Sequence, residues 1–175
     1  PTMHMHTTAT DRRQKPRRLV PLRPAAAPTA TIIEAPNPRT IALADASVAW
    51  NLANLASHHW MLGMFDERAQ DLIWKESVDT LIASSFVFPA GRATRVKGGY
   101  KLSGRWPFSS GVDSSAWNML AGIVSSEDDA DGVEYRVFLL KQDDYNLIDT
   151  WNSTGLKGTG SNDVEAKDVF VPEHM

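Results

Sequence analysis

The spacing of hydrophobic residues changes near residue 77 of this 175-residue chain, and this change constrains the fold more than any other feature. Before it, Val48, Leu52, Leu55 and Leu62 recur at the spacing of one face of an α-helix. After it, apolar residues come in short runs that are separated by glycine-rich or polar turns. The order predicts an α+β protein in which helices precede a compact β domain.

The helical part is expected over residues 44–75, with one interruption. Asp45 is the candidate N-cap of a first helix, which should end near Gly63, and Asp66 is the candidate N-cap of a second over residues 67–74. Such a short helix pair cannot bury both of its faces by itself, so we expect it to pack at the edge of the β domain.

Seven short β-type runs follow, and turn signals such as the Lys-Gly-Gly of residues 97–99 separate them. In the third run, Tyr100, Leu102 and Trp106 all lie at even positions, as expected for one buried face of a strand. Short strands at regular intervals predict an antiparallel sandwich or barrel. The runs cover residues 80–87, 92–96, 100–106, 117–124, 134–140, 145–151 and 163–171.

Residues 1–40 differ from the rest in composition. They hold seven of the ten prolines and seven Lys and Arg against two carboxylates, a net charge of +5 that leaves −8 for residues 41–175. A basic Pro/Ala-rich segment without periodicity predicts a disordered, solvated head, in preference to a nucleic-acid-binding or targeting segment. The acidic remainder argues against nucleic acid as a partner. Because the sequence starts at Pro1 and ends abruptly at Met175, we expect it to be a piece of a longer chain.

Composition and motifs exclude several function classes. The chain has no cysteine, which excludes disulfides and thiolate metal sites, and we expect no metal centre. No apolar run approaches the ~20 residues of a membrane helix, and no signal peptide is evident, so we expect a cytoplasmic protein without a membrane partner. Phosphate-binding loops, dinucleotide fingerprints, zinc-protease motifs and nucleophile elbows are also missing from the sequence.

Three groups of residues are candidates for a functional site. Trp50, Asn54 and His58 share one stripe of the first helix, although a hydrogen-bonded structural histidine is the commoner explanation of such a pattern. Ser84 and Ser85 end a β-type run before a Pro-Ala-Gly turn, which suits a ligand-facing strand end or an ordinary loop exit. Residues 104–111, Gly-Arg-Trp-Pro-Phe-Ser-Ser-Gly, combine large aromatic rings with two hydroxyls, as in a binding wall or a packed strand end.

Read in chain order, four strings resemble the middle domain of flavoproteins with the acyl-CoA dehydrogenase fold. They are residues 104–111, 113–121 and 151–163, and the ending Asp-Val-Phe-Val-Pro-Glu-His at 168–174. Within that superfamily the chain is most similar to the reduced-flavin-dependent two-component aromatic monooxygenases, of the p-hydroxyphenylacetate hydroxylase and secosteroid hydroxylase type. Residues 87–93 keep only the Pro and the Ala-Gly of the dehydrogenase loop, and this departure favours the monooxygenases.

The resemblance implies three segments and a set of site residues. Residues 1–40 are the head, 41–76 the end of an N-terminal helical domain and 77–175 the middle β domain, with a C-terminal helical bundle expected beyond this chain. His58 and Ser109 are the implied catalytic residues, Trp50 and Ser84 the implied substrate contacts, and Ser109, Ser110, Trp106, Phe108 and Ser85 the implied cofactor contacts. The sequence departs from the family at Ser114, where His is common after the Asp, and at Lys157, where Arg is commoner.

The implied function is hydroxylation of a small phenolic substrate with oxygen and reduced flavin, either FMN or FAD. A separate NAD(P)H-flavin reductase would supply the flavin, the full-length enzyme would form a homotetramer, and this piece alone would be inactive. Two alternatives stay open: an acyl-CoA dehydrogenase or related flavin oxidase, and a non-catalytic β-sandwich binding module that stacks Trp106 and Trp117 on a ligand.

Overall fold

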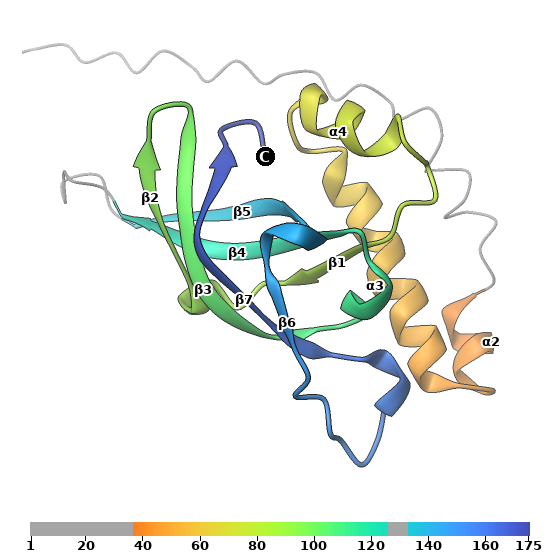
Figure 1. Cartoon of the computed structure of the whole chain (residues 1–175). Coiled ribbons are helices and arrows are strands. Elements are labelled where there is room, and N and C mark those ends of the chain that lie inside the picture. The colour runs from red at the N-terminus through yellow and green to blue at the C-terminus, as the bar shows by residue number, and fades with distance from the viewer. Residues whose placement is uncertain (1–36, 126–132) are drawn as a thin grey trace, which may run out of the picture.

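The computed structural model describes residues 37–125 and 133–175, which form helices followed by one curled sheet (Figure 1). The order confirms the α+β class. The expected disordered head lies outside the described residues, apart from its last few, of which 38–40 begin a short helix. The helices are α2 (Pro38–Ala42), α3 (Ala46–Leu62) and α4 (Glu67–Trp74). The strands are β1 (Ile82–Ser85), β2 (Gly91–Val96), β3 (Gly99–Ser109), β4 (Trp117–Ser125), β5 (Glu134–Lys141), β6 (Asn146–Ile148) and β7 (Asn162–Pro172).

The ends of α3 and α4 confirm the capping residues expected from the sequence. The Asp45 carboxylate accepts from the backbone N–H groups of Ser47 and Val48 at 2.8 and 3.0 Å, which otherwise lack partners in the first helical turn. Helix α3 ends at Gly63, and the Asp66 carboxylate caps α4. The turn between the helices lets α4 fold back beside α3 (Figure 1).

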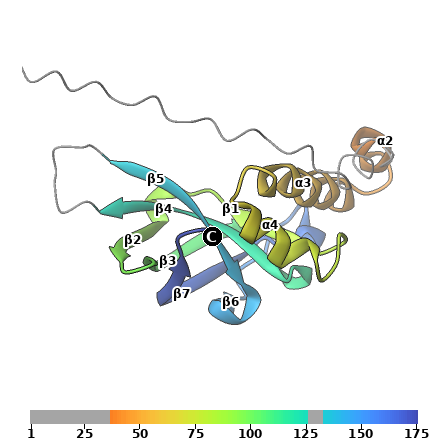
Figure 2. The same ribbon diagram turned by 90° about the horizontal axis from the view of Figure 1, so that it is seen from above.

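The helices pack against the sheet, as expected, and lie along one side of it (Figure 2). Three of their buried apolar residues form one cluster with residues of β1, β4 and β5. The helical members are Leu62, Ala69 and Ile73, and the sheet members are Ile82, Trp117, Met119 and Leu139. This cluster fixes α3 over the end of β1, where the candidate site residues lie.

All seven expected strands are present, in one sheet of order β1-β4-β2-β3-β7-β6 with β5 on the other edge of β4. The expectation of an antiparallel arrangement is wrong for two pairs, because β1 and β2 both run parallel to β4. They share one edge of it, β1 along residues 117–120 and β2 along residues 123–125. Hydrophobic alternation is the same in either direction, so the pattern of the sequence could not distinguish them.

The sheet curls so that the end of the chain after β7 comes back to β5. After β7 the chain turns back toward β5, where the Leu139 N–H donates to the Met175 carbonyl at 2.8 Å and the Arg136 guanidinium donates to the Glu173 carbonyl at 2.9 Å. The sixth strand is shorter than expected, since residues 149–161 leave the sheet as a long loop. That loop returns beneath α3 and contributes to the candidate site.

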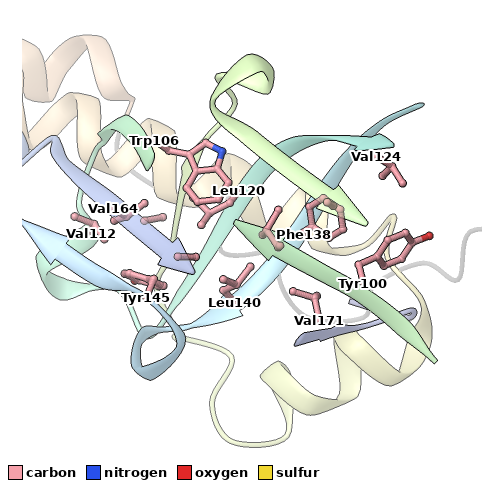
Figure 3. Packing of buried hydrophobic residues seen from close by; sticks show 14 residues of the cluster. Tyr100, Trp106, Val112, Leu120, Val124, Phe138, Leu140, Tyr145, Val164 and Val171 are labelled. Carbon is pink, nitrogen blue, oxygen red and sulfur yellow. The ribbon is translucent and has the colours of Figure 1, made fainter. Parts of the chain in front are cut away.

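The curl encloses the main core (Figure 3). Tyr100, Leu102 and Trp106 point into it, which confirms the alternation expected for the third strand. The Trp106 indole N–H donates to the Ala121 carbonyl at 2.6 Å, and its ring lies against Gly91 and Gly104. Trp106 and Trp117 are both buried, so neither offers a ring to an external ligand, and the alternative of a binding module that stacks these two residues loses its basis.

Candidate functional site

Helix α3 and strand β1 meet at His58, which is 1% exposed. Its Nδ1 lies 2.5 Å from the Ile82 carbonyl oxygen, which only accepts, so Nδ1 carries the proton. Nε2 lies 2.8 Å from the Ser84 hydroxyl, which therefore donates to it. Burial lowers the pKa of His58, the bond to the Ile82 carbonyl raises it and the neighbouring His59 lowers it further. The imidazole is thus held neutral, in one tautomer.

The structure brings His58 and Ser84 together, as the resemblance implied, but both ring nitrogens are already bonded within the chain. This geometry joins α3 to β1 and is the hydrogen-bonded structural role that the sequence pattern alone favoured. Phe86 packs edge-on against the imidazole at 6.0 Å between ring centroids. Any contact of His58 with a substrate would therefore pass through the hydroxyl of Ser84.

The two adjacent serines at the end of β3 differ in their surroundings. Ser109 is 0% exposed, and its hydroxyl accepts from the Asn118 amide at 2.9 Å. Ser110 is 6% exposed, and its hydroxyl accepts from the indole N–H of Trp50 at 3.0 Å. A direct contact between Ser109 and a bound cofactor, as the resemblance implied, has no exposed atom to make it. Ser110, among the implied cofactor contacts, lies nearer the surface.

A chain of hydroxyls continues from Ser110 into the loop below α3. The Ser110 and Ser161 oxygens are 2.8 Å apart, the Ser161 and Thr159 oxygens 2.7 Å, and Thr159 donates to the Leu156 carbonyl at 2.9 Å. The Leu156 carbonyl only accepts and the Trp50 indole only donates. Each of the three hydroxyls between them therefore accepts one hydrogen bond and donates the next, toward the carbonyl. The network holds Trp50 over the sheet although its ring is 52% exposed.

The remaining implied cofactor contacts fall into two groups. Phe108 is 63% exposed and packs edge-on against Trp151, with 6.3 Å between ring centroids. Trp106, in contrast, is enclosed by the core, and the buried Ser85 hydroxyl donates to the Pro107 carbonyl at 2.6 Å. Of these three, Phe108 alone presents its side chain to a ligand, and Ser85 supports the turn that carries it.

Sequence reasoning missed Trp151 and Asn162 as parts of this site. The Asn162 amide oxygen accepts from the backbone N–H groups of Thr150 and Trp151, and its amide nitrogen donates to Asp113 at 3.1 Å. The nearest signal in the sequence is the string Gly-Thr-Gly-Ser-Asn at residues 158–162, in which Gly160 adopts a left-handed conformation. The pattern indicates a tight turn and gives no indication of the loop that Asn162 holds.

The exposed rings and the neighbouring hydroxyl fit one edge of a flavin ring system. Trp50 and Phe108 provide aromatic surface, and Ser110 between them offers a polar atom, which is the mixture typical of a cofactor wall. Within residues 37–125 and 133–175, no three His, Asp or Glu side chains are grouped to hold a metal ion. None of the helices that the structure describes is long and apolar enough to cross a membrane.

Comparisons with known proteins agree with this fit, although no family model matches the chain. Oxygenase subunit HsaA of a flavin-dependent monooxygenase from Rhodococcus jostii is 41% identical over 136 residues, which cover 78% of this chain and 35% of the relative. The oxygenase component of an FADH2-dependent resorcinol hydroxylase from Rhizobium is 39% identical over 135 residues, 77% of this chain and 32% of the relative. The oxygenase component of p-hydroxyphenylacetate 3-hydroxylase from Acinetobacter baumannii is 34% identical over 136 residues, 77% of this chain and 31% of the relative.

Solved structures of flavin-dependent monooxygenases also match this chain. The 3-HSA hydroxylase from Rhodococcus sp. RHA1 matches with a TM-score of 0.68 and 41% identity over 73% of this chain and 33% of that protein. XiaF from Streptomyces, solved with FADH2 and glycerol, matches with a TM-score of 0.67 and 34% identity over 73% of this chain and 32% of that protein. The chain is therefore homologous to one part of the flavin-dependent monooxygenase oxygenase components with the acyl-CoA dehydrogenase fold, and spans about a third of the length of the relatives that it matches.

Proposed function

We propose that this chain forms one wall of the flavin and substrate site of an enzyme that hydroxylates a phenolic ring with oxygen. The observation that carries the proposal is the surface on which the exposed rings of Trp50 and Phe108 flank Ser110. The Trp50 indole donates to the Ser110 hydroxyl at 3.0 Å, and the Ser110 N–H donates to the Phe108 carbonyl at 3.0 Å. Two relatives that are named as resorcinol and p-hydroxyphenylacetate hydroxylases support a phenol as substrate.

The flavin, when bound, would activate oxygen, and the residues of this chain would bind and orient the flavin. Ser110 would donate to a flavin by turning its O–H away from Ser161, while its oxygen still accepts from the Trp50 indole. We propose FAD in preference to FMN, since the resorcinol hydroxylase depends on FADH2 and XiaF was solved with it. Ser109 would act behind this wall, by holding the strand end through Asn118.

His58 and Ser84 would act on the phenol as a relay. The phenol would donate to the Ser84 oxygen while the Ser84 hydroxyl donates to Nε2 of His58, which is neutral and free to accept a proton. Moving the proton along this path leaves the ring oxygen more negative and the aromatic ring more nucleophilic. Nδ1 keeps its proton throughout and donates it in the hydrogen bond to the Ile82 carbonyl.

The wider organisation is also a proposal. Residues 41–76 would be the end of the N-terminal helical domain and residues 77–175 the middle β domain of a cytoplasmic homotetramer with an added helical bundle. Relatives described as oxygenase components support a separate reductase that delivers the reduced flavin.

The test uses the complete gene product. With photochemically reduced FAD and resorcinol it should consume oxygen and release a hydroxylated product, and with an acyl-CoA it should not reduce a dye. Dye reduction with an acyl-CoA and no product from any phenol would contradict the proposal and favour the dehydrogenase alternative. Neither outcome depends on the behaviour of the 175-residue chain.

Paired serine variants of the same enzyme test the assignment within the wall. Ser110→Ala should lower product formed per oxygen and raise hydrogen peroxide, because a lost hydrogen bond to a reactive group costs about 1.5–3 kcal/mol, or one to two decades in rate. Ser109→Ala should leave this ratio nearly unchanged and lower the melting temperature, since it leaves the buried Asn118 amide without its partner. The reverse pattern would return the cofactor contact to Ser109.

A further inference from the structure

We propose that Asn162 is a positioning residue for Trp151, and that Trp151 and Phe108 form a corner that binds a planar aromatic ring. The ring would be the flavin or the phenolic substrate, so the inference rests on the proposed function and deepens it. We call Phe108 and Trp151 the aromatic corner.

Trp151 is held through its backbone by the side chain of Asn162. The amide oxygen of Asn162 accepts from the Thr150 N–H at 3.1 Å and from the Trp151 N–H at 3.0 Å. The indole N–H of Trp151 donates to the Leu156 carbonyl at 3.0 Å, so the side chain is tied at its far end as well. A partly buried tryptophan in a loop would otherwise sample several rotamers, and these bonds restrict it to one.

Asn162 is itself fixed by Asp113. Its amide nitrogen donates to the Asp113 carboxylate at 3.1 Å, so every polar atom of the buried Asn162 side chain has a partner. Asp113 reaches this place because residue 160 is glycine: a Cβ there would lie 2.2 Å from a carboxylate oxygen of Asp113. The string Gly160-Ser161-Asn162 thus joins the loop of Trp151 to the turn that follows Ser110.

Phe108 is held in place from the other side. It adopts a positive φ of 64°, which is rare for a residue with a side chain, at an irregularity in the pairing of β3 with β7. The preceding Pro107 carbonyl accepts from the buried Ser85 hydroxyl at 2.6 Å. A strained conformation that is supported by a buried hydrogen bond is typical of a functional surface. It turns the phenyl ring outward rather than into the core.

The two rings meet almost at right angles, with an interplanar angle of 88° and 6.3 Å between centroids. The edge of one ring therefore faces the other ring, and the exposed face of Phe108 is open to a further aromatic group. A planar ring that stacks on Phe108 would lie in the corner beside Trp151, and each such aromatic contact contributes beyond the buried area. A saturated ring of the same size would gain much less.

The experiment follows the Trp151 indole N–H of the ¹⁵N-labelled 175-residue chain by NMR, with the signal assigned through Trp151→Phe. The probes are FMN, resorcinol and cyclohexane-1,3-diol, each at millimolar concentration. FMN or resorcinol should shift the signal, and the saturated diol should not. A response to FMN identifies the flavin as the ring that is bound, and a response to resorcinol identifies the substrate. A signal that none of the probes moves, or that all three move equally, overturns the aromatic corner.

Variants of the Trp151 loop test whether Asn162 positions Trp151 for the binding of an aromatic ring. Asn162→Ala should weaken the binding that shifts Trp151 by about three- to tenfold, the equivalent of one or two hydrogen bonds. Ser153→Ala is the matched control, because its hydroxyl bonds to the Gly155 carbonyl within the same loop and does not hold Trp151. Wild-type affinity in Asn162→Ala, with an unchanged Trp151 signal, overturns the positioning role.

Exchanging Asn162 and Asp113 shows whether an effect comes from their hydrogen bond or from a general loss of folding. Asn162→Asp alone places two carboxylates against each other, whereas Asn162→Asp combined with Asp113→Asn restores a donor and an acceptor. The double variant should recover the Trp151 shift that the single variant loses, and no recovery would overturn the path from Asp113 to Trp151. Hydroxylation by the full-length enzyme without a Trp151 response contradicts this inference alone, and a Trp151 response without hydroxylation contradicts the proposed function alone.

Discussion

The hydroxyl of Ser84 lies 2.8 Å from Nε2 of His58, and this bond joins the first strand of the sheet to the longest helix of the described chain. Together with the bond from Nδ1 to the Ile82 carbonyl, it satisfies both nitrogens of a buried imidazole. The contact couples the folding of the helical part to that of the β domain, because neither element can supply these partners alone.

His58→Ala should therefore lower the free energy of unfolding of the 175-residue chain by about 2–4 kcal/mol, through the lost hydrogen bonds and the cavity left behind. Urea denaturation followed by circular dichroism measures the change. Ser57→Ala is the matched control on the same helical turn, since its hydroxyl is exposed and bonds only to the Asn54 carbonyl. Equal small effects for both variants would contradict the structural role of His58.

Stability should also depend on pH through His59. The indole N–H of Trp74 lies 3.2 Å from Nδ1 of His59, which can accept only while the ring is neutral. Burial lowers the pKa of His59 below its ordinary 6.5, while a bond to the Thr80 backbone and the charge of Asp79 raise it by less. The pKa of the neighbouring His58 is lowered as well, again mainly by burial.

The direction of this pH dependence follows from the lowered pKa values of the two histidines in the folded chain. Above about pH 6.5 both histidines are neutral in the folded and unfolded chains, so they add no pH dependence. Below it the unfolded chain takes up protons first, and stability falls as the pH drops toward the folded pKa values. Urea midpoints at pH 8, 7, 6 and 5 should show a plateau and then a decline. His59→Asn should make the decline shallower, and a decline of wild-type steepness in that variant would contradict this assignment.

Gly91 tests the packing around Trp106, and Gly155 serves as the control. A Cβ at position 91 would lie 2.5 Å from the Ala121 carbonyl oxygen and 2.6 Å from Cζ2 of the Trp106 ring. Gly91→Ala should therefore destabilise the fold by about 1–3 kcal/mol, as overpacking does. At Gly155 an added Cβ meets nothing within 4 Å, so Gly155→Ala is the control and should change the thermal midpoint little. Equal midpoints for the two variants would be inconsistent with this packing.

Phe108 allows the cost of its backbone conformation to be measured directly. Glycine adopts a positive φ without strain, whereas alanine keeps the steric cost of a Cβ, and both lack the phenyl ring. Phe108→Gly should therefore be more stable than Phe108→Ala by about 1 kcal/mol, although both lose the contact with Trp151. Chemical denaturation of the two variants side by side gives the difference. If alanine were the more stable of the two, the left-handed conformation would not hold in solution.

Local patterns in the sequence were enough to predict the separate helices and strands of the sheet. Asp45 and Asp66 cap their helices as expected, since a carboxylate satisfies N–H groups only two or three residues away. The alternation of Tyr100, Leu102 and Trp106 predicted the buried face of β3, because the period of a strand is a property of its own backbone. The other strands were predicted as short β-type runs between turn signals, which are also local features.

How these elements combine, and which side chains reach the surface, depends on contacts between residues that are far apart in the chain. The parallel pairing of β1 and β2 with β4 depends on the path of the chain between them, which no local pattern records. Near the positive φ of Phe108, the Ser109 hydroxyl lies against Asn118 and the Ser110 hydroxyl beside Trp50, which the spacing of the residues alone could not reveal. Asn162 acquires its role from Asp113, 49 residues earlier in the chain, because a buried amide is satisfied by whichever partners the fold brings within 3 Å or so.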